Sequence, residues 1–267
     1  MRVILLTFLL FYNQLASAQL SVAVSNLLDP SSGVYFQDGS DPFSSGINAA
    51  GNARMKKKGL GLSSEKKYGF QGFNMMSLSL AIPVSSGCWS GQIDYFGFNH
   101  FSETRIGFCY AKTLSARADL GVRFNYLQVQ IPGSQLRAAI CPQIGFRYIL
   151  NQNLILGWSV SNPAGALKIR GEYHLPTGYR IGVGYKISDL SGVAVEMIKE
   201  EGRFPGITAA FRYRPEKNLE IRAGLYTQSP QVFFTMVVQK NKLKYAAGFM
   251  WHRELGFSPS LVWYCFF

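Results

Sequence analysis

Few residues of this chain have the types and spacing that acid–base or nucleophilic chemistry needs. No G-x-S-x-G elbow is present, and the three histidines are His100, His174 and His252. Spacing alone leaves open a serine–histidine pair acting in a membrane. The adjacent carboxylates Glu200 and Glu201 stand beside Arg203, which is typical of a solvated turn. We therefore expect no enzyme activity and structural roles for the histidines.

The cysteines give no sign of a metal site or another cofactor. They form no C-x-x-C pair and no cluster with histidine. They fall in separate segments of the chain, and an exported protein would be able to form disulfides. We expect mostly unpaired thiols, buried or facing lipid, at Cys88, Cys109, Cys141 and Cys265.

The charge balance is basic, because 27 Lys and Arg against 15 Asp and Glu give a formal net charge of +12. Such a balance fits nucleic acid, an anionic membrane surface or an anionic ligand. The run Lys56–Lys58 is typical of a solvated or phosphate-facing strand start. One interpretation is that basic side chains decorate turns and a hydrated interior. Attraction to lipopolysaccharide phosphates or to a carboxylate cargo stays open.

Residues 1–18 have the features of an export signal. Met1-Arg2 is a short positive region, residues 3–12 are apolar, and Ala16-Ser17-Ala18 predicts cleavage before Gln19. Export by the Sec route argues against nucleic acid as a partner and places the chain in the cell envelope. The remaining sequence has no apolar run of 18 residues, so we expect no transmembrane helix.

From residue 56 onward, apolar and polar residues alternate in segments of about ten residues. A strand that crosses a bilayer at a tilt needs roughly 9–11 residues, with one face for lipid and one for the interior. The sequence therefore predicts an all-β fold, a closed antiparallel transmembrane β-barrel of about 14 strands over residues 56–267. The predicted strands lie near residues 56–64, 70–82, 88–98, 101–113, 118–130, 137–149, 153–161, 178–187, 191–200, 206–214, 218–227, 231–239, 243–252 and 258–267.

The charged face of each segment must be the interior face, because an arginine at mid-bilayer costs about 2–4 kcal/mol on the lipid face. The interior then has a positive excess. Two interpretations stay open: these side chains pair with each other and hold a plug, or they line a ligand path. The interior candidates are Glu103, Arg105, Asp119, Arg123, Arg147, Arg180, Lys186, Glu196, Arg212, Arg222 and Lys244.

The two ends of the mature chain differ from the middle. Residues 19–55 are rich in Ser, Asn, Asp and Gly and alternate only weakly. About 14 strands enclose a lumen that is wider than side chains alone fill, so we expect this lead segment to act as a plug. At the other end, Trp263 and the terminal Phe267 share one face of an alternating strand. Such an ending is similar to the signal read by the outer-membrane barrel assembly machinery.

Several short motifs resemble the family of long-chain fatty-acid transporters (FadL-like). Residues 48–53, NAAGNA, resemble the family's NPAGLA segment just before the first strand, with Ala49 in place of the proline. Residues 56–68 are similar to its first strand and first external loop. Residues 92–110, 120–126 and 252–260 resemble strands of short Bacteroidetes members, including PorV and PorQ of type IX secretion. The matched plug motif comprises Asn48, Ala50, Gly51 and Ala53.

The resemblance implies an outer-membrane barrel with an N-terminal plug and a bend in the third strand that opens the wall laterally. Gly87, Gly91 and Gly97 would permit such a bend. The implied function is to bind or pass small hydrophobic or amphipathic molecules across the outer membrane. The alternative is a non-transporting accessory barrel of a secretion system. Expected partners are outer-membrane lipid, lipopolysaccharide and the assembly machinery, with either a small hydrophobic ligand or secretion-system proteins.

Overall fold

The computed structural model describes residues 32–36, 40–70, 72–98, 101–133, 135–163, 167–170, 175–228 and 230–267. The predicted signal peptide over residues 1–18 lies outside these ranges, as do residues 19–31 of the lead segment. His100 and His174 also lie outside them. The boundaries of the signal and of the lead segment therefore stay predictions.

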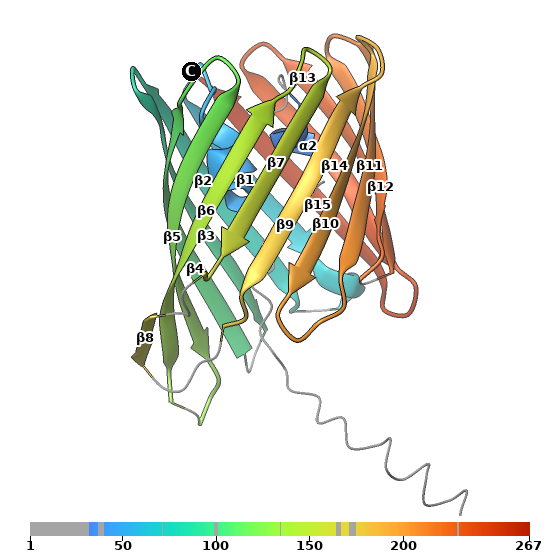
Figure 1. Cartoon of the computed structure of the whole chain (residues 1–267). Helices are drawn as coiled ribbons and strands as arrows, with labels where there is room; N and C mark the ends of the chain where they lie inside the picture. Colours follow the sequence, from blue (N-terminus) through green and yellow to red (C-terminus); the bar gives the residue numbers. More distant parts are fainter. Residues whose placement is uncertain are drawn as a thin grey trace, which may run out of the picture.

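The described strands form one closed antiparallel sheet (Figure 1). Apart from β8, each strand pairs with the strands before and after it in the chain, so that β7 pairs with β9. The pairs β1–β15 and β5–β6 close the ring. The short strand β8 pairs only with one end of β6, so the wall itself consists of the other 14 strands. The strands are β1 (Gly59–Lys66), β2 (Asn74–Val84), β3 (Gly87–Phe98), β4 (Phe101–Thr113), β5 (Ala118–Gln130), β6 (Arg137–Ile149), β7 (Leu154–Ser161), β8 (Leu167–Arg170), β9 (Gly178–Lys186), β10 (Ser191–Glu200), β11 (Gly206–Glu216), β12 (Leu219–Tyr226), β13 (Gln231–Lys240), β14 (Leu243–His252) and β15 (Gly256–Phe266).

The predicted fold class is confirmed, and the largest differences lie around the first strand. β1 begins at Gly59 rather than at residue 56, so the run Lys56–Lys58 precedes the strand. A short 3-10 helix, η2 (Lys67–Gly69), follows β1, and Tyr68 within it has a φ of 54°. This turn delays β2 to Asn74, whereas alternation alone predicts a start near residue 70. β8 is an addition within the longest connection, and its four residues are too short for the alternation to reveal.

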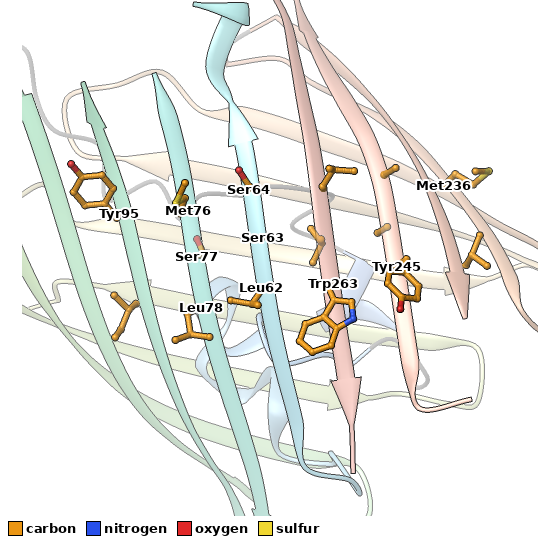
Figure 2. A pocket seen from close by; sticks show the side chains of 16 residues that line it. Leu62, Ser63, Ser64, Met76, Ser77, Leu78, Tyr95, Met236, Tyr245 and Trp263 are labelled. Atoms are coloured by element: carbon orange, nitrogen blue, oxygen red, sulfur yellow. The ribbon is translucent and has the colours of Figure 1, made fainter. Parts of the chain in front are cut away.

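The wall is apolar outside and polar inside. Along β4, Ile106 and Phe108 are 46% and 58% exposed, whereas Arg105 and Cys109, on either side of this pair, are buried. The same alternation continues around the sheet, and Figure 2 shows part of the outer face, with apolar side chains standing on adjacent strands. A surface of this kind is unfavourable in water and favourable in a bilayer, as membrane-spanning barrels require. None of the described helices is long and apolar enough to cross a membrane.

The two ends of the barrel have different connections. At one end, tight turns are closed by backbone bonds, such as those from Leu114 to Ala118 and from Leu150 to Leu154. The chain's C-terminus lies at this end, at the top of Figure 1. The opposite end has the longer connections, including residues 162–177 with β8. Because short turns are periplasmic and long loops external in such barrels, we assign the short-turn end to the periplasm.

The described part of the lead segment lies inside the barrel (Figure 1). It contains α2 (Ser32–Tyr35), α3 (Ser44–Ile47) and a 3-10 helix, η1 (Ala49–Asn52). η1 packs against β4, β5 and β6, and α2 packs against β7 and β9. Glycine makes this close approach possible, because a methyl group at Gly121 would lie 2.1 Å from the carbonyl oxygen of Ala49.

Candidate functional site

The plug motif docks on the inner wall through Asn48. Its side-chain oxygen accepts a hydrogen bond from Ala50 N at 2.9 Å, which caps η1. Its side-chain nitrogen donates to the carbonyl oxygens of Phe146 on β6 and Trp158 on β7, at 3.3 and 3.1 Å. Ala50 is fully buried, and Gly51 and Ala53, which follow it, are also buried. One side chain thus shapes the helix and fixes it to two strands.

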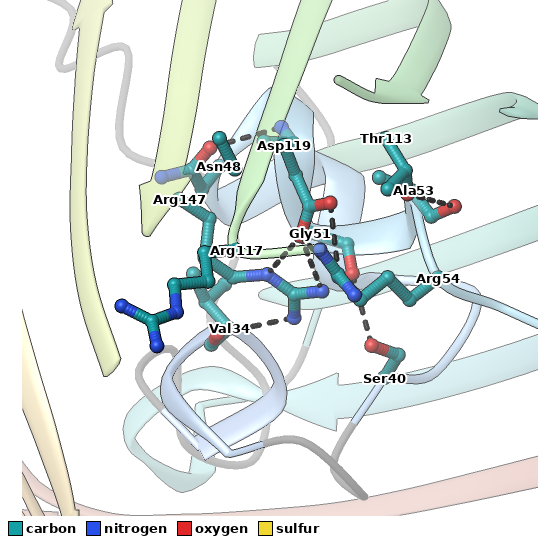
Figure 3. A network of polar contacts seen from close by, with 12 residues as sticks. Val34, Ser40, Asn48, Gly51, Ala53, Arg54, Thr113, Arg117, Asp119 and Arg147 are labelled. Carbon is teal, nitrogen blue, oxygen red and sulfur yellow. Dashed lines mark hydrogen bonds and ion pairs between the residues drawn. The ribbon is translucent and has the colours of Figure 1, made fainter. Parts of the chain in front are cut away.

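A buried carboxylate fastens the end of the lead segment to the wall (Figure 3). Asp119 on β5 is fully buried and accepts from Nε of Arg54 and Nε of Arg147, both at 2.9 Å. Arg54 also donates to the carbonyl of Ser115 in the β4–β5 turn, and Arg147 donates to that of Val34 in α2. Three parts of the chain therefore meet at one negative charge. We call Arg54, Asp119 and Arg147 the plug clasp.

The start of the described lead is held further round the wall, by β9 and β10. The hydroxyl of Tyr35 donates to Glu196 on β10 at 2.7 Å, and Arg180 on β9 donates to the other oxygen of that carboxylate at 3.2 Å. Burial, followed by the neighbouring charge of Glu196, raises the pKa of Tyr35. The ring of Phe36 lies 3.9 Å from the guanidinium carbon of Arg212, a cation–π contact.

A third charged group lies on β11, β12 and β14. Glu220 accepts from Arg222 and from Arg214, and the side chain of Lys244 lies 5.8 Å from the ring centroid of Tyr264. Asp41 of the lead segment is buried, and this burial raises its pKa, although Arg222 and Lys244 act in the opposite direction.

The centre of the interior contains a basic cluster on the external side of the plug. Arg105 pairs with Asp94 at 2.8 Å. Arg123, only 1% exposed, donates to Asn125 at 2.7 Å, and to Ser45 and Gln92 at 3.3 Å. These are neutral oxygens. Arg105, Arg123 and Arg180 border one small polar cavity of about 20 Å³, room for a single water molecule. The cavity is completed by Gly46, Asn125, Gln143, Ser159 and Ser161.

An apolar cluster adjoins this basic cluster on its external side. Leu127 and Val129 follow Asn125 along the inner face of β5 and are almost fully buried. They pack with Ala139 and Cys141 of β6, with Leu175 from the long connection and with Phe101. A chain of ring contacts at about 6 Å centroid spacing extends from Phe101 through Phe96 and Phe73 to Phe70. The external half of the interior thus passes from apolar to basic.

The remaining predicted residues lie at the edges of this arrangement. Glu103 is half-buried on β4, two residues external to Arg105. Lys186 lies at the periplasmic end of β9 and pairs with Asp189 in the following turn, so it is outside the central clusters. Trp263 and Phe267 face outward. His252 accepts from the backbone of Glu254 and Leu255 and thereby shapes a turn, as expected for a structural histidine.

The four cysteines are unpaired and the third strand is regular. All four thiols are free, three of them buried, and Cys109 donates to the carbonyl of Ala49. No group of three His, Cys, Asp or Glu in the described ranges could hold a metal ion. β3 pairs without a register break with both β2 and β4, so the glycines at 87, 91 and 97 do not bend it open. The implied lateral opening is absent from β3.

Sequence reasoning misses the neutral half of the site. Asn125 and Gln143 complete the basic cluster. They are uncharged, so the free-energy cost of a charge on the lipid face does not assign them to the interior. Their parity with Arg123 and Arg147 is the signal that would find them. Arg54 is missed because it follows the plug motif outside any strand, where alternation assigns no face. Its position directly after a buried segment is the signal that would find it.

Comparison with known proteins shows what the barrel is similar to. No family model matches the sequence, and no curated protein matches it. Among solved structures, the CymD monoaromatic hydrocarbon channel superposes with a TM-score of 0.66 at 12% identity, covering 94% of this chain and 99% of that one. The toluene transporter TbuX of Ralstonia pickettii gives 0.65 at 10% identity, covering 91% and 97%. The toluene transporter TodX of Pseudomonas putida gives 0.58 at 10% identity, covering 93% and 96%. At these identities the likeness shows the fold.

Proposed function

We propose that this protein is an outer-membrane barrel, exported by the Sec route, that binds small amphipathic molecules with an acidic head group and passes them across the membrane. The observation that carries the proposal is the junction of the apolar cluster with the basic cluster in the external half of the interior. The FadL-like motif at residues 48–53 and the fold shared with hydrocarbon channels support a hydrophobic part of the cargo.

The charge of Arg123 supports an acidic head group. A buried cation is costly unless an opposite charge lies close to it. Asp94 is engaged by Arg105, and the hydrogen bonds of Arg123 within the described residues go to Asn125, Gln92 and Ser45. A carboxylate or a similar group entering the cavity would provide two charge-assisted bonds. An uncharged hydrocarbon would provide no opposite charge for the guanidinium of Arg123.

The apolar cluster supports a hydrophobic tail on the same ligand. Leu127, Val129 and Leu175 present buried methyl groups on the external side of Arg105 and Arg123. Each methylene that packs there contributes about 0.8 kcal/mol. The cavity of about 20 Å³ beside Arg123 is smaller than such a tail, so a tail that binds there displaces side chains of this cluster. Passage requires the lead segment to move from the periplasmic half.

A binding experiment tests both halves of the ligand. We expect purified full-length protein in detergent to bind dodecanoate more tightly than dodecanol, which has the same tail without the charge. Arg123→Gln should remove this preference, a loss of tenfold or more for dodecanoate, because a charge-assisted pair contributes about 1.5–3 kcal/mol. Arg137→Gln, at an exposed position at the external end of β6, is the matched control. Equal binding of the two compounds would contradict the proposal.

A second function, an accessory barrel that docks secreted proteins, rests on the external surface. Phe204 in the β10–β11 connection is 89% exposed, and Phe70 and Leu255 near the same rim are also exposed. Exposed apolar side chains on loops are typical of protein contacts. Deletion of the gene separates the two functions: loss of surface-secreted proteins would favour the accessory role, and loss of fatty-acid uptake would favour transport.

A further inference from the structure

The outer wall has an apolar hollow that spans six consecutive strands, β13, β14, β15, β1, β2 and β3 (Figure 2). Its volume is about 710 Å³, within the range of small-molecule sites. Two small side chains create it: Ala247 and Ser64 both pair with Leu261, one from each neighbouring strand. Leu261 is therefore 67% exposed and stands as a ridge with a depression on either side. Met236 and Met76 form the outer borders of these depressions.

A dense group of lysines lies at the periplasmic end of the same strands. The carbonyl of Lys58 accepts from Phe267 N at 3.0 Å, and that of Lys242 accepts from Phe266 N at 2.8 Å. Lys58 and Lys242 thus lie on either side of the end of β15. Lys56, Lys57 and Lys240 are exposed beside them. The segments 54–59, 84–87 and 240–243 contain no Asp or Glu, so the charge of these segments is positive.

The hollow and the lysines have the separation of a lipid tail and its head group. Trp263 and Tyr245, which border the hollow toward the periplasm, pair with each other across β14 and β15. Trp263 precedes Phe267 by roughly 13 Å along the strand, at about 3.3 Å per residue. Aromatic side chains at this depth mark the membrane interface. The hollow therefore begins within the hydrocarbon region, directly below a cationic head-group level.

We propose that this face binds an anionic diacyl phospholipid of the periplasmic leaflet. Its phosphate lies among Lys58, Lys242 and their neighbours, and its two acyl chains lie on either side of Leu261. Cationic side chains attract anionic head groups. The depressions on the two sides of Leu261 can each hold one acyl chain, whereas a flat wall would hold no chain at a fixed place. The site needs the barrel to be in a membrane, but it is independent of what the barrel transports.

Tryptophan quenching by brominated lipids tests the proposal on the full chain. In a variant with Trp89→Phe, Trp158→Phe and Trp251→Phe, Trp263 reports the occupancy of the hollow. We expect brominated phosphatidylglycerol to quench Trp263 more strongly than brominated phosphatidylcholine at equal mole fraction in mixed vesicles. The relative association should favour the anionic lipid by roughly fivefold for each lysine close to the surface. Inorganic phosphate in the buffer should not abolish this preference.

Two pairs of variants separate a built site from general attraction. Lys58→Gln with Lys242→Gln should remove most of the preference, whereas Lys112→Gln with Lys217→Gln, exposed residues toward the same end but outside the six strands, should not. Ala247→Phe should weaken anionic-lipid quenching by filling one depression, whereas Ala209→Phe on β11 should leave it unchanged. Heat-modifiable mobility in detergent gels verifies that each variant is folded.

Four results would overturn the proposal. Equal quenching by the two lipids would show that the head group is not recognised. An equal loss in both lysine pairs, or no effect of Ala247→Phe, would show only diffuse surface attraction. Weak quenching by every lipid would show that a protein, such as a second copy of this chain, covers the face.

Discussion

At the scale of single residues, Asp119 holds the plug clasp together. Its carboxylate is fully buried and bonds both Arg54 and Arg147, and the Arg147 side chain is itself almost inaccessible. Asp119→Asn leaves the charge of Arg147 buried without its partner, which costs about 3–5 kcal/mol in comparable cases. We expect the free energy of unfolding to fall by this order, measured by urea titration of the protein in lipid vesicles.

The control for this variant is Arg54→Gln. It keeps the pair between Asp119 and Arg147, and Arg54 is partly solvent-exposed, so the loss should be about 1 kcal/mol. If both variants lost the same free energy, the clasp would depend on Arg54 rather than on the buried pair.

Asp41 gives the lead segment a predicted pH dependence. Because burial raises its pKa, the folded protein retains a proton that the unfolded chain releases, so stability falls as the pH rises. The decline begins near about pH 4, the ordinary value for aspartate, and ends above the raised pKa. Asp41→Asn should flatten the curve of unfolding free energy against pH and be the more stable form at pH 7.

Asp189 is the control, because its pKa is shifted in the direction opposite to that of Asp41. The hydrogen bond from Lys186 lowers the pKa of Asp189 in an exposed turn, so its contribution is present above about pH 4 and lost in acid. Asp189→Asn should therefore leave the decline toward neutral pH in place. If Asp41→Asn had the same profile as the wild type, Asp41 would not be the group responsible.

At the scale of elements, the seat of η1 depends on two inward-facing glycines. A methyl group at Gly145 would lie 2.1 Å from Asn48 Oδ1, and one at Gly121 would meet the backbone of Ala49 as closely. Gly121→Ala with Gly145→Ala should push η1 from the wall at a cost of about 1–3 kcal/mol. We expect trypsin to cleave after Arg54 faster while the barrel stays folded.

The comparison for that experiment is Gly91→Ala on β3. Its added methyl group would meet Gly107 O at 4.0 Å, an ordinary contact, so cleavage after Arg54 should stay at the wild-type rate. Equal cleavage in both variants would mean that the lead segment is not held by its fit to β5 and β6.

The elements also show how far the sequence predicts this molecule. Strands such as β4 and β5 have the predicted bounds, because membrane burial forces alternation over their whole length. The start of β2 and the extra strand β8 depend on turn geometry and on a contact with β6 that alternation does not encode. Arg123 is assignable to the interior by its cost in lipid. Its neutral partner Gln92 reaches it across Gly107 of β4, through the strand register, and Ser45 reaches it through the docked plug.

At the scale of the whole molecule, the interior is divided into two zones. The periplasmic half is filled by α2, α3 and η1, which bond to strands on several sides of the wall. The external half contains the apolar and basic clusters, and two polar cavities beside Arg180 measure about 20 Å³ each. Because a ring of about 14 strands is wider than its own side chains fill, the lead segment rather than the wall fills the periplasmic half of the lumen.

This division predicts the electrical behaviour of the barrel in a planar bilayer. The full-length protein should give no resolved conductance steps, because bonded residues of the lead segment occupy the periplasmic half. Deletion of residues 32–52 removes α2, α3 and η1 and should produce discrete steps, since water then connects both ends. The opened pore should prefer anions over cations, measured as a reversal potential in a salt gradient, because Arg105, Arg123, Arg147 and Arg180 line it. The deletion variant could remain folded, as judged by its heat-modifiable mobility, and still give no conductance steps. That result would mean that the wall and its external loops close the pore.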